Sequence, residues 1–341
     1  MSPSICRSDI PFMVHLPRYP MGRRGKEIQV ANQEKRTSIG GQALIEGILM
    51  RGPFKQAIAV RDQAGEIVLT TEELKFIKDR YPVLGLPLIR GVVNFGGAMV
   101  SGVKALMYSA SFYPEEETGE PGRFEQWLEK HIGSEKMESV IIYLAVALGV
   151  CFSVGLFMLL PTFLVGLIAP IHENYLLRNL CEGLMKVVIF TIYMIAVSRL
   201  PDMRRAFSYH GAEHKTIKCY ELGKELTVEN VRPCVRFHPR CGTSFLFVVI
   251  IISILVGSVI RLSNTLLRIL CHLALLLPVV AISYEFNRLV GRHDNALTRF
   301  LSAPGMWFQN FTTNEPDDSM IECAIAAMKA VIPEEEGADN W

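Results

Sequence analysis

Apolar and polar positions divide the chain into a tail, a strand-rich segment and a series of long hydrophobic stretches. Residues 1–37 show little apolar periodicity and include a basic run at 23–26, a pattern that predicts a flexible basic tail. Across 38–82, short apolar runs alternate with glycine-containing turns, one of them at Ala64 and Gly65. This pattern predicts a small antiparallel strand unit that contains a hairpin.

About four later stretches are long and apolar enough to cross a bilayer, which predicts a membrane domain over 140–290. They cover residues 140–165, 176–200, 245–260 and 266–290. Pro161 predicts a kink in the first of them. The preceding segment, 83–110, is also apolar, but glycines, a proline, Arg90 and Lys104 interrupt it. That composition favours an amphipathic helix at the membrane interface over a span.

Basic residues indicate on which side of the membrane each loop lies. The loop 201–244, between the second and third predicted spans, is rich in lysine and arginine, whereas the opposite loops carry few such residues. Because positively charged loops stay in the cytosol, this loop, the strand unit and both termini are predicted to be cytosolic. Residues 303–332 are predicted to form a cytosolic amphipathic helix, with Asn314 as its cap and Pro316 in its first turn. The expected role of this helix is packing alone.

Composition agrees with a membrane protein and excludes some other classes. Of the 341 residues, 50% are hydrophobic and only 20% are charged, which is low for a soluble domain. The net charge of +1 gives no support for nucleic-acid binding, so the expected partner is the lipid bilayer. The predicted fold is therefore an α-helical multi-pass membrane protein with about four spans. Its small cytosolic α+β unit is built from the N-terminal strands, the helix of the central loop and the C-terminal helix.

The central loop carries the candidate chemistry. Asp202 can cap a helix that Gly223 ends, and His210, Glu213 and His214 lie within it as an H-x-x-E-H pattern. Two imidazoles four residues apart share a helix face and can bind one divalent cation, most readily Zn²⁺. The adjacent carboxylate of Glu213 can then act as a general base on water. The same pattern also arises by chance, and histidines beside a membrane also serve as headgroup anchors, so a structural role stays open.

Further metal ligands must come from elsewhere in the chain. His238 and Cys241, just before the third predicted span, form a nitrogen–sulfur pair of metal-ligand type, although an isolated cysteine also serves as a small apolar filler. Glu221 lies two turns beyond His214, and Glu285 lies at the predicted cytosolic end of the fourth span. The predicted topology brings all of these residues to one membrane face.

Polar residues also occur inside the predicted spans. Glu182 and Lys186 lie four residues apart in the second span, and His272 lies at a similar depth in the fourth. Charges within a membrane often mark an ion or proton pathway, which would suit a small transporter. All three residues lie near an outer end, so snorkelling to the interface is the alternative.

Several motifs resemble those of the bacterial YqhQ family, in order, between about Ser38 and Val331. They are residues 40–53, 90–94, 209–216, 238–244, 283–285 and 314–318. The family is a domain of unknown function described as predicted metal-dependent membrane enzymes. The resemblance therefore implies a multi-pass protein of the bacterial cytoplasmic membrane and supports a metal, but it supplies no substrate.

The resemblance also draws attention to Glu46 and Arg51, two charged residues in an apolar, glycine-flanked segment. As substrate-binding residues, they would include an arginine that binds a phosphate or carboxylate group. The alternative is an internal Glu46–Arg51 ion pair that closes the fold over the membrane face.

Three functions follow from these residues. The leading hypothesis is a membrane-embedded metallohydrolase with a peptide or lipid-linked substrate. Its metal would be held by His210, His214, His238 and Cys241, and its catalytic carboxylates would be Glu213 and Glu285. The second is a non-enzymatic scaffold or assembly factor with a structural metal, in which protein ligands fill every position. The third is a small transporter that uses the polar residues within its spans.

Overall fold

The computed structural model describes residues 35–75, 80–113, 134–168, 174–258, 262, 264–293 and 295–340. The predicted tail at 1–37 lies outside this part except for its last three residues. The strands are β1 (Gly40–Leu44), β2 (Gly47–Arg51), β3 (Lys55–Arg61) and β4 (Ile67–Glu73). The helices up to the central loop are η1 (Pro82–Gly85), α2 (Ile89–Ala110), α4 (Ser134–Val154), η2 (Gly155–Leu159), α5 (Leu160–Gly166) and α6 (Tyr175–Val197). They are followed by α7 (Pro201–Glu221), α8 (Val228–Val231), α9 (Gly242–Gly257), α10 (Thr265–Ala274), α11 (Leu276–Arg292), α12 (Ala296–Thr312) and α13 (Asp318–Val331).

The predicted strand unit is confirmed as a four-stranded antiparallel sheet in the order β1-β2-β3-β4. Gly65, at φ +88°, forms the turn between β3 and β4, a conformation that glycine adopts without strain. Four of the five residues of β2 are buried, so it does not show the alternation of a half-exposed strand. Its apolar run therefore reflects a strand that is covered on both faces.

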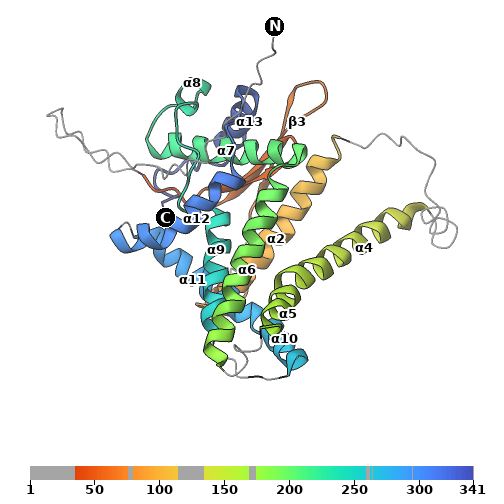
Figure 1. Cartoon of the computed structure of the whole chain (residues 1–341). Helices are drawn as coiled ribbons and strands as arrows, with labels where there is room; N and C mark the ends of the chain where they lie inside the picture. The colour runs from red at the N-terminus through yellow and green to blue at the C-terminus, as the bar shows by residue number, and fades with distance from the viewer. Residues whose placement is uncertain are drawn as a thin grey trace, which may run out of the picture. The chain divides into compact units, whose positions relative to one another are not determined.

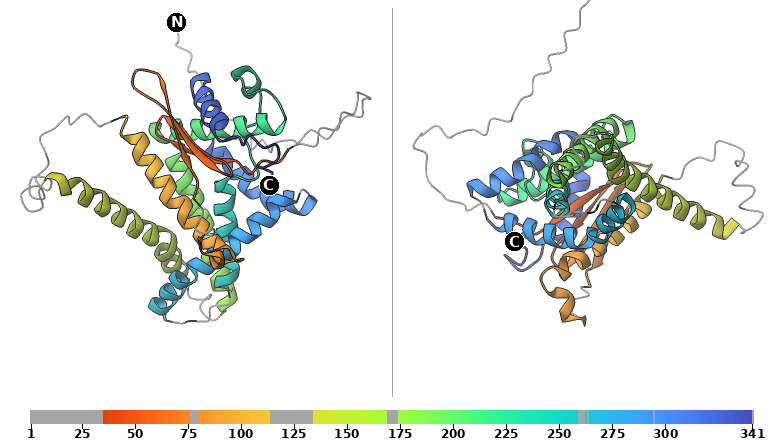
Figure 2. Two further views of the ribbon diagram at one scale, coloured as in Figure 1. Left: turned by 180° about the vertical axis from the view of Figure 1, so that it is seen from behind. Right: turned by 60° about the horizontal axis from the view of Figure 1, so that its bottom comes forward.

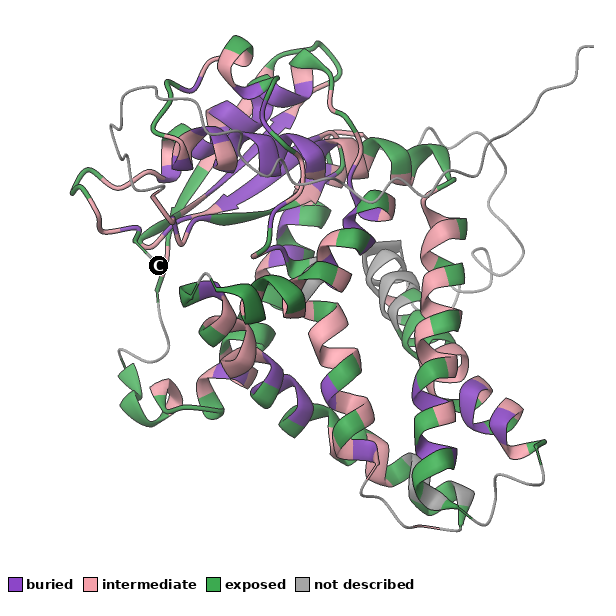
Figure 3. Ribbon diagram, turned by 60° about the vertical axis from the view of Figure 1, so that its left-hand side comes forward, coloured by how far each residue is buried: buried purple, intermediate pink, exposed green. Residues whose placement is uncertain are grey.

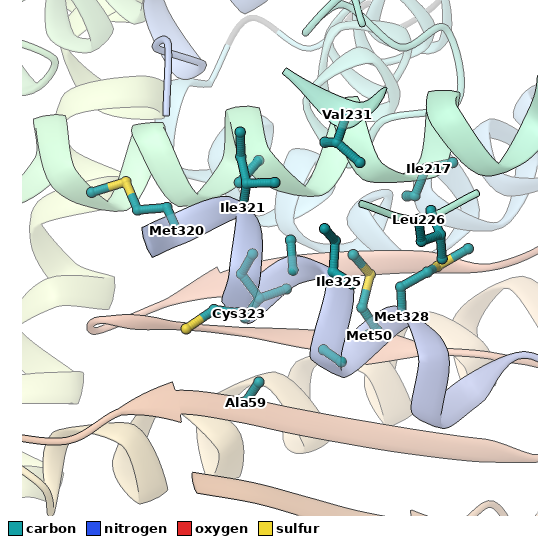
Figure 4. Packing of buried hydrophobic residues seen from close by; sticks show 14 of the residues in the cluster. Met50, Ala59, Ile217, Leu226, Val231, Met320, Ile321, Cys323, Ile325 and Met328 are labelled. Carbon is teal, nitrogen blue, oxygen red and sulfur yellow. The ribbon is translucent and has the colours of Figure 1, made fainter. Parts of the chain in front are cut away.

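One face of the sheet packs on α7 and α13, and the other packs on α2 (Figures 1 and 2). On the first face, Met50 and Ala59 contact a cluster that includes Ile217 of α7 and Ile321 and Met328 of α13 (Figure 4). On the second face, the side chains of Leu44, Leu49, Ile58 and Val60 surround Ala105 of α2. The sheet, α7 and α13 therefore share one core, as expected of the α+β unit.

Buried residues are concentrated around this sheet, whereas the long helices below it are mostly exposed or half-buried (Figure 3). Two helical segments are long and apolar enough to cross a membrane, Ala147–Gly166 and Leu176–Val197. Only 17% and 11% of their most apolar windows are buried, respectively. Apolar helices with so little protein cover are typical of contact with lipid.

The other two predicted spans take different forms. The segment at 245–260 contains a shorter apolar helix, Phe245–Gly257, and its last two residues lie outside the described part. The segment at 266–290 is divided between α10 and α11, which meet at Leu275. Within the described residues, two spans are thus supported by length and composition, and an architecture of four spans stays a prediction. Near the predicted kink, the π-helical turn η2 directly precedes α5, whose second residue is Pro161.

The central helix closely matches its prediction, and the C-terminal segment differs from its prediction. α7 begins at Pro201, so the prediction of Asp202 as its cap is wrong: the N-cap is Leu200, which makes no side-chain cap bond, and Asp202 lies in the first turn. Gly223 follows the end of the helix at φ +66°, as predicted. Residues 303–332 do not form one helix: α12 ends at Thr312, and α13 begins at Asp318. The cap of α13 is Asp317, because Pro316 favours an extended chain in the residues before the helix.

Replacing Asp317 with alanine should lower the free energy of unfolding by about 1 kcal/mol, because its carboxylate accepts the N–H of Met320 (2.9 Å) and caps α13. Burial alone would raise the pKa of Asp317, but hydrogen bonds from Ser319 and Met320 lower it below its ordinary value. This contribution is therefore present above the unfolded pKa of about 3.9 and is lost as the pH falls through the folded value. Thermal unfolding at several pH values measures both effects, and D317N, which keeps a capping oxygen, is the control.

Candidate metal centre

Helix α7 presents the three residues of the H-x-x-E-H pattern at its crossing with the C-terminal segment. Asn314 donates its backbone N–H to the carbonyl of Phe207 (2.8 Å), which holds this segment against the helix. At Gly211, a Cβ atom would lie far inside van der Waals contact with the carbonyl oxygen of Asn314. The glycine between His210 and Glu213 therefore permits the close crossing, and the segment after α12 forms one wall of the site.

His210, His214 and Cys241 come together at one point. Their ligand atoms all lie within 4.8 Å of one another. The Nε2 atom of His210 lies 3.1 Å from the sulfur of Cys241, and the two imidazole centroids are 4.4 Å apart. His214 and Cys241 are buried, with exposed fractions of 1% and 7%. This group could hold a metal ion.

Backbone carbonyl groups orient both imidazoles. The Nδ1 atom of His210 lies 2.7 Å from the carbonyl oxygen of Thr312, at the end of α12. The Nδ1 atom of His214 lies 2.5 Å from the carbonyl oxygen of Arg236, in the loop before α9. A carbonyl can only accept, so each ring carries a proton on Nδ1, and Nε2 is the nitrogen left for the group. Histidine ligands of metals are commonly held in this way.

The charges in the group favour a thiolate at Cys241. Burial alone would raise the pKa of its thiol, but the imidazoles of His210 and His214 lower it well below its ordinary value. Burial alone would likewise lower the pKa of His210, but the sulfur of Cys241 raises it. The thiolate is the form of cysteine that binds a metal.

Glu213 lies beside the group and is buried, with an exposed fraction of 5%. Burial raises the pKa of its carboxyl group, and the two imidazoles oppose that shift. The backbone N–H of Gly41 in β1 donates to this carboxylate, and a Cβ atom on Gly41 would lie only 2.9 Å from its Cδ atom. Among the described residues, neither Oε2 of Glu213 nor Nε2 of His214 has a hydrogen-bond partner. Buried polar atoms without a partner are rare in folded proteins, so each of these two atoms is able to bind a ligand.

His238 lies next to the group, but its ring faces Glu221 and not the three candidate ligands. Gln309 of α12 accepts its backbone N–H (2.9 Å) and donates to its carbonyl (2.8 Å). Its Nε2 atom lies 3.5 Å from the carboxylate of Glu221, which also forms an ion pair with Arg240. Burial lowers the pKa of His238, and Glu221 opposes the shift. His238 therefore lies beside the candidate group, where its ring is 5.7 Å from that of His214.

Glu285 lies apart from the group, on α11. Its carboxylate accepts hydrogen bonds from Nε (2.7 Å) and Nη2 (2.5 Å) of Arg90 on α2, and from the N–H of Leu88 (3.2 Å). The pair joins the start of α2 to α11.

The two predicted substrate-binding residues are separated in the structure. Glu46 accepts both donors of a bidentate ion pair with Arg205 of α7, and it also accepts the hydroxyl of Tyr209 (3.3 Å). Arg51, at the end of β2, is half-buried and forms no hydrogen bond or ion pair through its side chain within the described part of the chain. The internal Glu46–Arg51 pair is thus replaced by Glu46–Arg205.

The polar residues of the long helices also come together. Glu182 is buried and forms an ion pair with Arg178 one turn away (3.3 Å). Glu182, Lys186 and His272 line a cavity of about 10 Å³, between α6, α9 and α10. That volume is close to the minimum for one water molecule, so it does not form a continuous pathway.

Sequence reasoning missed the residues that hold the candidate metal-binding group in place. Thr312 and Arg236 contribute backbone carbonyl groups, which every residue has, so their residue types do not indicate this role. Gly41 and Asn314 lie within the motifs at 40–53 and 314–318, and these motifs were the only signal for them.

The fold and site define a mostly helical protein with a four-stranded sheet and a histidine–cysteine group that could hold a metal ion. The chain matches the family described as a protein of unknown function (DUF1385) over residues 86–334. It is also 33% identical over 298 residues to the uncharacterized protein YqhQ of Bacillus subtilis (strain 168). The matched residues make up 86% of this chain and 92% of that protein. The chain therefore belongs to the YqhQ family, which confirms the resemblance. No solved structure matches it.

Proposed function

We propose that this protein is a metal-dependent hydrolase embedded in the bacterial cytoplasmic membrane, with its metal site facing the cytosol. The observation that carries the proposal is the orientation of the two imidazoles. His210 and His214 each direct Nδ1 at a backbone carbonyl and leave Nε2 for the group that contains Cys241. This is the arrangement expected of metal ligands and their supporting shell.

The residues of the group fit a divalent ion, and zinc most readily. Two imidazole nitrogens and one thiolate are ligands that Zn²⁺ prefers. The Nε2 atom of His214 is buried and has no hydrogen-bond partner among the described residues, so it is available as a metal ligand. Three protein ligands would leave the ion able to bind water or substrate, as in catalytic zinc sites. His238 is the nearest candidate for a further ligand.

Glu213 supplies the proposed acid–base chemistry. A divalent ion held by the three ligands supplies Lewis acidity and lowers the pKa of water. Glu213 would accept the proton of that water at Oε2, and the raised pKa of its carboxyl group suits a general base. The N–H of Gly41 holds the carboxylate in place. Glu285, paired with Arg90, has no part in this mechanism.

The proposed topology has about four spans, with both termini in the cytosol. Two apolar helices of sufficient length, the shorter helix at Phe245–Gly257 and the α10–α11 segment support it. The site then lies where the cytosolic unit meets the membrane, a location that suits a peptide or a lipid-linked substrate.

Glu213→Gln tests the catalytic role. The variant should keep its bound metal, because Glu213 is not one of the three ligands, and should lose about 100-fold or more of its activity, because the amide cannot accept a proton. The measurements are elemental analysis of detergent-purified protein and complementation of a strain that lacks the gene. Full complementation by a variant with normal metal content and normal stability would refute the hydrolase.

The burial of the ligands favours one alternative, a scaffold or assembly factor with a structural metal. His214 and Cys241 are almost inaccessible to solvent, as in closed structural sites. In that case E213Q should complement fully, whereas loss of a ligand should unfold the protein. The pair of variants therefore separates the two functions.

A further inference from the structure

A second site lies apart from the metal centre, in a cavity of about 490 Å³. Residues of the sheet and its flanking loops, of η1, of α2 and of α11 line it, together with Asn340 near the C-terminus. This volume falls within the usual range of small-molecule sites, so it accommodates a headgroup-sized ligand as well as a single ion.

The lining of the cavity is strongly cationic. Its basic residues are Arg51, Lys75, Arg90, Arg288 and Arg292, and none of its described lining residues is acidic. The only carboxylate paired with these cations in the described part of the chain is Glu285, on Arg90. Glu285 also interacts electrostatically with Arg288, so one carboxylate faces the cationic lining within the described part of the chain.

Arg51 is the residue of the lining whose environment most clearly favours a bound anion. Its guanidinium is half-buried and has no hydrogen bond or ion pair within the described residues, although the register of β2 fixes its backbone opposite Gly40 and Gln56. A guanidinium removed from water is costly unless an acceptor is present. Asn94, Tyr284 and Asn287 add polar groups to the same lining.

The rim of the cavity is apolar. Leu84 and Gly85 of η1 line it, and their neighbours Val83, Leu86 and Leu88 are 62%, 51% and 49% exposed. Large exposed apolar side chains beside a cationic cavity suit a ligand that has an anionic head and an apolar tail.

We propose that this cavity binds the phosphate group of an anionic ligand, with Arg51 and Arg288 as its principal contacts. The planar fork of a guanidinium matches phosphate oxygens in a bidentate manner, which favours phosphate over a smaller monovalent anion. The exposed apolar rim places a phospholipid-like amphiphile ahead of a soluble phosphate. The proposal does not depend on the metal centre, because none of the cavity residues belongs to it.

The experiment is a binding titration of the detergent-purified full chain with two probes. One probe is phosphatidic acid in mixed micelles, with phosphatidylcholine as the reference lipid, and the other is inorganic pyrophosphate. Phosphatidic acid should bind more tightly than phosphatidylcholine, and added salt should weaken the binding because the attraction is ionic. Tighter binding of phosphatidic acid than of pyrophosphate identifies the amphiphile as the source, and the reverse identifies a soluble phosphate.

The variants Arg51→Gln and Arg288→Gln should each weaken binding of the preferred probe about tenfold. Arg232→Gln is the matched control: its side chain is exposed and pairs with Asp318, away from the cavity, so it should leave binding unchanged. Thermal unfolding of each variant verifies folding. Chelation of metal should leave binding intact, which separates this proposal from the hydrolase. Failure of both probes to bind, or an equal loss in R232Q, would overturn the proposal.

Discussion

Replacing His214 with alanine should remove stoichiometric metal from the purified protein. The Nε2 atom of His214 is buried and has no hydrogen-bond partner among the described residues, and it lies within 4.8 Å of the ligand atoms of His210 and Cys241. Loss of a residue that merely supports a ligand already costs about 10–100-fold in metal affinity, so loss of a ligand should cost about 100-fold or more. Elemental analysis after gel filtration, with competition against a chelator of known affinity, measures the change.

His293→Ala is the matched control for this prediction, because His293 is exposed and lies outside the group. It should leave the metal content unchanged. H238A decides the number of ligands: a large loss of affinity would make His238 the fourth, and a small one would leave the position open. Full metal content in H214A would contradict the metal centre itself.

Gly211→Ala should destabilise the protein by about 1–3 kcal/mol or more, because the added methyl group would overlap the carbonyl oxygen of Asn314. Relief of the overlap requires the segment after α12 to move away from α7, and Thr312, which orients His210, belongs to the end of that helix. The variant should therefore lose metal affinity as well as stability. Thermal unfolding with and without added zinc measures both.

Gly96→Ala is the control for this change. Gly96 also lies within a helix, α2, but a Cβ atom there would meet nothing within 4 Å. Alanine is the better helix former by about 0.5–1 kcal/mol, so this variant should be neutral or slightly more stable. Equal stability of G211A and G96A would show that the crossing at Asn314 is not needed.

The elements with strong local signals could be predicted from the sequence. Helix α7 has Asp202 in its first turn, although not as its cap, and Gly223 just after its end, and both signals are local in sequence. The strands were found because glycine-containing turns separate their apolar runs. The cover on both faces of the sheet could not be predicted, because it depends on α2 and α13, which lie far away in sequence.

The candidate site was predicted in part. The spacing of His210 and His214 was sufficient to place them on one face of a helix. The spacing of His238 and Cys241 suggested a pair, but the N–H of Cys241 donates to the carbonyl of His238 (3.3 Å) in a tight turn. In the structure Cys241 faces His210, and His238 faces Glu221. Such directions are set by tertiary packing, which the spacing of two residues in a loop does not encode.

The shared core of the sheet, α7 and α13 also constrains the order in which the protein can be completed. Its members come from three distant parts of the chain, represented by Met50, Ile217 and Met328. Contacts between such distant segments form slowly, because a long loop must close before they stabilise the fold. During synthesis, the sheet face that packs on α13 and the side of α7 next to it therefore stay exposed until α13 has left the ribosome. A nascent chain arrested before Asp318 should accordingly need a chaperone that prevents aggregation through the exposed apolar face of its sheet.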